Sequence, residues 1–118
     1  MGNPEHLLQE AVRLHQSSDF KKGLETAEKA RKEFLKEKNP GRAIEALRVM
    51  GDCAVNARDF KLAQKLYDEL LSDAVSTSNL FYQAAACWGI GQIASHKMNY
   101  SEALDSFQTG LKIARQIA

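Results

Sequence analysis

A two-residue pattern that recurs at one fixed spacing limits what this chain can fold into. An aspartate or asparagine followed by an aromatic residue occurs three times, at equal intervals of 40 positions, as Asp19-Phe20, Asp59-Phe60 and Asn99-Tyr100. Small residues recur with it, nine positions before and three positions after each aromatic residue, at Ala11, Gly51, Gly91, Gly23, Ala63 and Ala103. A fixed period of this size is typical of a stack of similar structural units.

The segments between these pairs have the apolar spacing of helices. Apolar residues recur every three or four positions in six segments, and none shows the two-residue alternation of a strand. Polar or Pro/Gly breaks separate the segments, at Ser17-Ser18, Asn39-Pro40-Gly41 and Ser76-Thr77-Ser78-Asn79. The expected helices cover residues 4–17, 19–38, 42–57, 60–75, 80–96 and 100–118. Six helices with short breaks predict an all-α chain of three antiparallel hairpins.

Two features predict how the core is filled. Segment 80–96 is the least polar of the six, which predicts a helix buried on most sides. The two cysteines, Cys53 and Cys87, lie among apolar residues without the spacing of a metal site, so we expect reduced core thiols.

Length and charge exclude several classes of protein. The 118 residues suit one domain, and the formal net charge of +1 gives no field that would attract nucleic acid or membrane. The basic stretch from Lys29 to Lys38 is interleaved with glutamates and is expected to be a solvated helix face. No signal peptide or membrane-spanning run is visible, so we expect a cytoplasmic protein without nucleic-acid or membrane partners.

The recurring small and aromatic residues resemble the tetratricopeptide repeat (TPR) family. The similarity is carried by Leu47, Met50, Gly51, Ala54, Phe60, Ala63 and Tyr67, and again by Cys87, Ile90, Gly91, Ala94, Tyr100, Ala103 and Phe107. It implies one TPR-like domain over residues 1–118, an α-solenoid with a right-handed superhelical stack and repeats at approximately 3–40, 41–79 and 80–118. The first repeat matches weakly.

The period departs from the usual TPR length of about 34 residues. This longer period looks like that of the long-repeat TPRs of Pins-type adaptors and kinesin light chains. HEAT-type repeats share this period and remain an alternative, although the glycine and aromatic positions fit the TPR pattern better.

No catalytic constellation accompanies the repeats. The chain lacks a Gly-rich phosphate loop, an H-E-x-x-H metal motif and a nucleophile elbow. We therefore expect no enzyme, cofactor or metal site, but a scaffold or adaptor that binds a protein or peptide. The alternative is a helical regulatory domain that senses a small molecule in its groove.

The resemblance also implies where a partner binds, because TPR arrays generally bind peptides or helices on the concave face lined by the first helix of each repeat. The residues expected there are Leu8, Val12, Arg48, Asp52, Asn56, Trp88, Gln92 and His96. A carboxylate clamp of lysine and asparagine is not expected, since Leu8 and Val12 stand where it would begin.

Several of these residues have two open interpretations. Trp88 suits an interface hot spot, but also packing against the preceding repeat. Arg48 and Asp52 suit a row of peptide contacts, but also an internal ion pair on a solvated helix. His96, like His15, lies near a helix end and is either exposed to solvent or placed at a groove edge.

The last helix is expected to leave apolar side chains uncovered. Leu104, Phe107, Leu111 and Ala114 follow a 3-4-3 spacing and should pack on the fifth helix, which leaves Ile113 and Ile117 outside. Either the chain is a fragment of a longer repeat array, or two copies form a homodimer through the C-terminal helix. A few scattered exposed residues on a monomer are the alternative.

Overall fold

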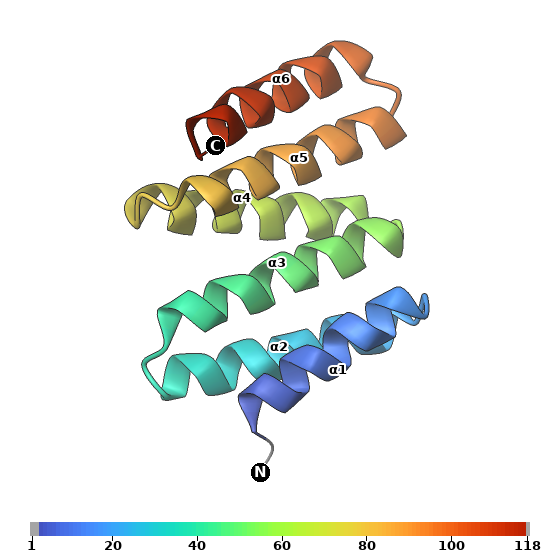
Figure 1. Cartoon of the computed structure of the whole chain (residues 1–118). Coiled ribbons are helices and arrows are strands. Elements are labelled where there is room, and N and C mark those ends of the chain that lie inside the picture. Colours follow the sequence, from blue (N-terminus) through green and yellow to red (C-terminus); the bar gives the residue numbers. More distant parts are fainter. Residues whose placement is uncertain (1–2, 118) are drawn as a thin grey trace.

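A computed structural model describes residues 3–117 and shows six helices without a strand in that range. The helices are α1 (Pro4–Gln16), α2 (Phe20–Lys36), α3 (Pro40–Asn56), α4 (Phe60–Ser76), α5 (Leu80–His96) and α6 (Tyr100–Ile117). Figure 1 shows them stacked in order along the molecule, with the N-terminus and the last hairpin at opposite ends. The all-α prediction is confirmed.

One turn geometry joins all the helices. The residue after each helix C-cap has a positive φ of 54° to 66°, and these residues are Ser18, Lys38, Arg58, Ser78 and Met98. In the first turn, the N–H of Asp19 donates to the carbonyl of Leu14 over 2.8 Å. This is the Schellman motif, which satisfies the last free carbonyls of a helix. One helix with its turn is therefore the repeating unit of the backbone, and it is half as long as the spacing between the aromatic residues Phe20, Phe60 and Tyr100.

The residue that ends each turn also begins the next helix. Asn39, Asp59 and Asn79 occupy N-cap positions, where each side-chain oxygen accepts a hydrogen bond from a backbone N–H three residues later. Asp19 is an N-cap without such a side-chain bond. The predicted break at Asn39-Pro40-Gly41 is thus the start of α3, which begins at Pro40 rather than at Arg42.

Each helix packs only on its neighbours in the stack, as far as the described residues show. α1, α3 and α5 pack on one another in sequence, whereas α2 and α4 pack on the helices before and after them along the chain and are joined to each other by the ion pair of Arg31 with Glu69, over 3.1 Å. We call the surface formed by α1, α3 and α5 the odd-helix face. α6 contacts α5 alone. The stack measures 45 × 29 × 22 Å.

The core is centred on α3 and not on α5. α3 touches four other helices, and most of its side chains from Ala43 to Val55 are buried. α5 lacks a neighbour on one side, so that Phe81 and Trp88 are more than half exposed. Segment 80–96 is nevertheless buried on most sides, as predicted, since α5 contacts α3, α4 and α6 and only Phe81, Trp88, Ser95 and His96 are exposed. Cys53 and Cys87 are free thiols in buried positions, as expected.

The packing of α6 differs from the prediction in register. α6 meets α5 through the buried residues Ala103 and Gly110, and the Phe107 ring approaches Gly91. Leu104 and Leu111, which were expected in this contact, are 56% and 49% exposed. Ile113, which was expected outside it, is half-buried.

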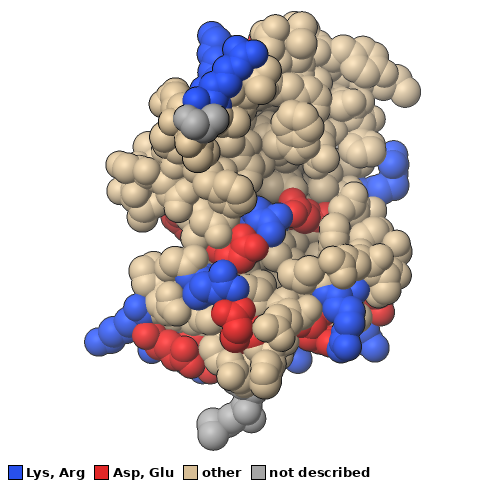
Figure 2. Space-filling view, in the orientation of Figure 1, with Lys and Arg blue, Asp and Glu red and all other residues tan. Residues whose placement is uncertain are grey.

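Charge is distributed unevenly over the stack. Figure 2 shows most of the charged side chains on the half that holds α1 to α3, and few over α5 and α6. The sequence of α5 contains no aspartate, glutamate, lysine or arginine. None of the six described helices combines the length and the apolarity that crossing a bilayer requires.

Candidate functional site

A pocket of about 290 Å³ opens on the odd-helix face where α1, α3 and α5 meet. Its lining contains five of the eight residues predicted to contact a partner. The lining residues are His15, Arg48, Asp52, Asn56, Ala85, Trp88, Gly89 and Gln92. Residues from three hairpins converge here, because one side of each of α1, α3 and α5 faces the same space.

The other three predicted residues do not line this pocket. Leu8 is 3% exposed and packs in the core, so its side chain does not form part of the odd-helix surface. Val12 is half-buried against the same core. The exposed His96 ring stacks on Phe60 at a centroid distance of 5.2 Å, near the turn that leads to α6.

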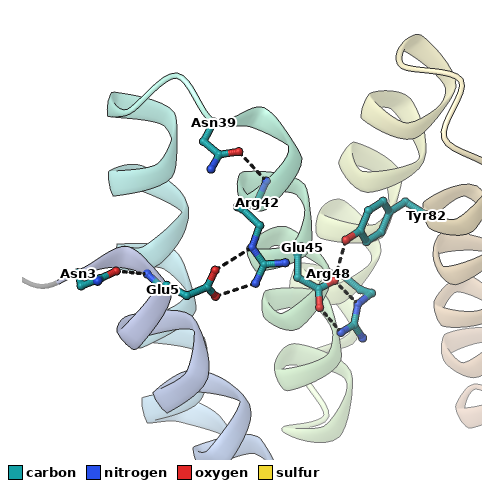
Figure 3. A network of polar contacts seen from close by, with 7 residues as sticks. All are labelled: Asn3, Glu5, Asn39, Arg42, Glu45, Arg48 and Tyr82. Carbon is teal, nitrogen blue, oxygen red and sulfur yellow. Dashed lines mark hydrogen bonds and ion pairs between the residues drawn. The ribbon is translucent and has the colours of Figure 1, made fainter.

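Arg48 is held by two carboxylates of its own helix. Its guanidinium donates to both oxygens of Glu45, over 2.9 and 2.8 Å, and to Asp52 over 2.8 Å (Figure 3 shows the Glu45 contacts). The internal ion pair considered from the sequence is therefore present, and it includes a second acid. Burial alone would raise the pKa of Glu45. The hydrogen bonds from Arg48 and Tyr82, together with the positive charge of Arg48, outweigh this effect, so the pKa of Glu45 is lowered.

Two tyrosines from outside α3 fix these carboxylates. Tyr82 of α5 donates its hydroxyl to Glu45 over 3.0 Å, and Tyr67 of α4 donates to Asp52 over 2.6 Å. Burial raises the pKa of Asp52 above its ordinary value, more than the Tyr67 bond and the Arg48 charge lower it. The polar wall of the pocket is thus held in place from three helices.

A similar ion pair lies further along the odd-helix face. Arg42 of α3 donates two hydrogen bonds to Glu5 of α1, over 3.0 and 2.7 Å, as Figure 3 shows. This bidentate pair joins the first two hairpins, next to the Glu45 and Arg48 pair in the same view. The polar side chains on this part of the face are therefore mostly bonded to one another.

His15 is a pocket residue that the predicted site omitted. It lies 2.7 Å from the Asn56 side-chain nitrogen, across the contact between α1 and α3. The same Asn56 nitrogen donates to the backbone carbonyl of Asp52 over 2.9 Å. Helical spacing and its place near a helix end put His15 at a groove edge, but they do not reveal that α3 supplies a partner 41 residues away.

Trp88 and Gln92 are the pocket residues with side chains that are still free to bond. Among the described residues, neither the indole N–H nor the Gln92 amide makes a hydrogen bond. Trp88 is 54% exposed, and one edge of it packs on Phe107 at a centroid distance of 4.7 Å. The aromatic partner of Trp88 thus belongs to α6 of its own hairpin and not to the preceding repeat, and the role of Trp88 as a hot spot stays a prediction.

A larger groove, of about 400 Å³, lies between α4 and α6 on the opposite side of α5. Its lining mixes Ile90 and Ile93 with charged residues such as Lys97 and Asp105. A similar hollow of about 240 Å³ recurs between α2 and α4. The even-numbered helices of neighbouring hairpins do not pack closely on each other, although the Arg31–Glu69 ion pair bridges α2 and α4. Such a gap therefore follows from the stacking itself and does not indicate a specific site.

Within residues 3–117, no group of three or more histidine, cysteine, aspartate or glutamate side chains is placed to hold a metal ion. Comparisons with protein-family models, curated proteins and solved structures found no significant match to this chain.

Proposed function

We propose that this chain is a protein-interaction module of the TPR type, an α-solenoid that binds a peptide or helix of a partner protein. Two observations support this proposal. The helix pairs recur at a regular period, and each pair contacts only the neighbouring pairs. In it, the stack is right-handed, the odd-helix face is the concave surface, and the chain has no catalytic role.

One observation carries the choice of site: the pocket combines a pre-ordered polar wall with an accessible tryptophan. Arg48, Asp52 and Glu45 are bonded to one another and to tyrosines, so little conformational entropy is lost when a ligand packs on them. Trp88 offers an aromatic surface of the kind that contributes strongly at protein interfaces.

The free groups suit a peptide. The Gln92 amide can donate to and accept from a peptide backbone, and the indole of Trp88 can cover an apolar side chain. The guanidinium of Arg48 is already shared between two carboxylates, so the pocket lining presents no uncommitted cation for a free carboxylate. The expected ligand is therefore an internal segment with an apolar side chain and no acidic residue at the pocket.

A peptide-display selection on the immobilised native chain tests this function. Peptides that are enriched should bind the native chain and the Lys65→Ala variant equally, because Lys65 is exposed on α4 outside the pocket. Trp88→Ala should weaken binding about 30-fold or more, as expected for a hot-spot residue worth about 2 kcal/mol. Gln92→Ala should weaken it less.

Controls separate binding from folding. Circular dichroism and a denaturation curve should show that Trp88→Ala keeps the native helix content. If a folded Trp88→Ala variant binds the selected peptides as the native chain does, the pocket is not the site. If no peptide is enriched, but calorimetry detects a metabolite whose binding depends on Gln92, the small-molecule regulatory alternative replaces the proposal.

A further inference from the structure

The polar wall of the odd-helix pocket carries more negative than positive charge. Further along the face, Arg42 is matched by one carboxylate, that of Glu5. At the pocket, the guanidinium of Arg48 lies between two carboxylates, those of Glu45 and Asp52. One guanidinium against two carboxylates leaves this wall with a formal charge of −1. α5, which forms the opposite wall, has no charged side chain to balance it.

The charge of Asp52 is the less well compensated of the two. Its oxygens accept hydrogen bonds from Tyr67 and from Arg48, so the carboxylate needs no proton of its own to satisfy these donors. Burial nevertheless raises the pKa of Asp52, whereas the pKa of Glu45, which shares the same arginine, is lowered. Burial thus penalises the charge of Asp52 more than its neighbours stabilise it. A cation that entered the pocket would supply the missing stabilisation.

The pocket lining holds no second cation for this purpose. His15 is the only other lining residue that can carry a positive charge. Its Nε2 atom lies 2.7 Å from the amide nitrogen of Asn56, which can only donate, so Nε2 is the acceptor and the imidazole is neutral. The source that remains for a positive charge is the ligand.

The opposite wall offers a surface of the kind that attracts cations. Trp88 of α5 is 54% exposed and lines the same pocket as Asp52 of α3. Tryptophan is the side chain that attracts a cation over its ring most strongly. The chain makes such a contact elsewhere, where the guanidinium of Arg58 lies 5.3 Å from the centre of the Phe60 ring. Within residues 3–117, no arginine or lysine is placed in this way over Trp88.

We propose that the peptide segment bound in this pocket places a lysine or arginine side chain between Trp88 and Asp52, beside its apolar residue. This inference rests on the proposed function and names the class of segment that the pocket selects, a basic one. The methylene stem of such a side chain packs on the indole, and its charged group donates to the carboxylate of Asp52. An acidic residue in the same place would be repelled by the wall.

Peptide-display selections with a library of random peptides test this preference. Peptides selected on the native chain should contain lysine or arginine at one position about 5-fold more often than the unselected library. Asp52→Asn has nearly the same shape and can still accept from Tyr67, but it lacks the charge, so peptides selected on it should lose the preference. Asp68→Asn is the matched control, because it removes the same charge from an exposed position of α4 outside the pocket.

A selected peptide, synthesised with its basic residue and again with norleucine in that place, measures the contact directly. Norleucine keeps the apolar stem and removes the charge. Calorimetry should show that the native chain binds the norleucine form about 5-fold more weakly, and that Asp52→Asn binds the two forms alike. Raising the salt concentration from about 0.05 M to about 0.5 M should weaken binding of the basic form to the native chain more than binding of the norleucine form. The salt measurement needs no variant, so it applies even if Asp52→Asn does not fold.

The results separate this inference from the proposed function. Selected peptides whose binding depends on Trp88, but which are not enriched in basic residues, would overturn the inference and leave the proposed function standing. The inference also fails if a folded Asp52→Asn variant keeps the preference, if Asp68→Asn loses it equally, or if salt weakens both forms of the peptide alike. If no peptide is enriched on the native chain, the proposed function fails and this inference fails with it.

Discussion

The ring of Tyr67 in α4 lies against the backbone of Gly89 in α5, so closely that a Cβ atom at Gly89 would be 2.3 Å from the ring. The same ring also approaches Gly51 of α3, where a Cβ atom would be 2.8 Å away. One aromatic side chain thus packs between the first helices of two successive hairpins. Its hydroxyl group bonds to Asp52, so this ring joins the core to the wall of the candidate pocket.

Gly89→Ala should destabilise the protein, although alanine favours helix more than glycine does. The added methyl group would overlap the buried Tyr67 ring, and such overpacking typically costs about 1–3 kcal/mol. Gly41→Ala is the matched control, because the nearest atom to a Cβ there is 3.9 Å away. Urea denaturation should show a lower free energy of unfolding for Gly89→Ala and little change for Gly41→Ala. Equal curves for the two variants would contradict the observed packing.

Tyr67→Phe should cost more stability than Tyr82→Phe. Both changes remove a hydroxyl that donates to a carboxylate, but Tyr67 is fully buried and its partner Asp52 would lose a short bond inside the stack. Asp52 is half-buried and keeps its bond from Arg48, so the loss should be about 1 kcal/mol, at the low end of the cost of leaving an acceptor without its donor. Tyr82 is less buried, and Glu45 keeps both bonds from Arg48. Denaturation curves that rank the two variants in the opposite order would contradict this account.

The helices could be predicted from the sequence because their ends are marked locally. An asparagine or aspartate recurs at half the aromatic period, at Asn39 and Asn79 as well as in the three aromatic pairs, and a helix begins directly after each of them. For α6, the neighbour was predicted correctly, but the residues that pack on it were predicted in the wrong register, for a physical reason. Spacing shows that a helix has an apolar side, but which part of that side the adjacent helix covers depends on the packing of the whole stack.

The candidate site could be predicted only in part. The bonds of Arg48 to Glu45 and Asp52 follow from spacings of three and four residues in one helix, which the sequence shows. The bonds from Tyr67 and Tyr82 join residues 15 and 37 positions apart, and they depend on how the hairpins stack. The burial of Leu8 depends likewise on its tertiary neighbours.

Met98→Gly should stabilise the protein. Met98 has a φ of 62° in the turn between α5 and α6, a conformation that costs a residue with a side chain about 1 kcal/mol and costs glycine much less. Its side chain is exposed, so little packing is lost. Lys97→Gly is the control, since Lys97 has a φ of −86° and gains nothing from glycine. Thermal unfolding should show a higher midpoint for Met98→Gly and an unchanged or lower midpoint for Lys97→Gly.

Stability should fall as the pH rises above about 8.5, where free cysteine begins to ionise. Burial, and then the charge of Asp52, raises the pKa of the Cys53 thiol to about 11. Burial and the charge of Glu45 raise the pKa of Tyr82 to about 12. Burial and the charge of Asp52 likewise raise the pKa of Tyr67. Between the unfolded and folded pKa values, the native state keeps protons that the unfolded state has lost.

The free energy of unfolding should therefore be constant up to about pH 8, and then fall by about 1–3 kcal/mol by pH 10.5. Urea denaturation at several pH values measures this change, and tyrosinate absorbance shows whether the two tyrosines ionise with unfolding. Burial also raises the pKa of the Cys87 thiol, so Cys53→Ala should reduce the part of the loss that begins near pH 8.5, and Cys53→Ala with Cys87→Ala should remove it. Both variants should keep the part that begins near pH 10, where free tyrosine ionises. A free energy of unfolding that does not change up to pH 10.5 would mean that these groups titrate in the folded protein as they do in the unfolded chain.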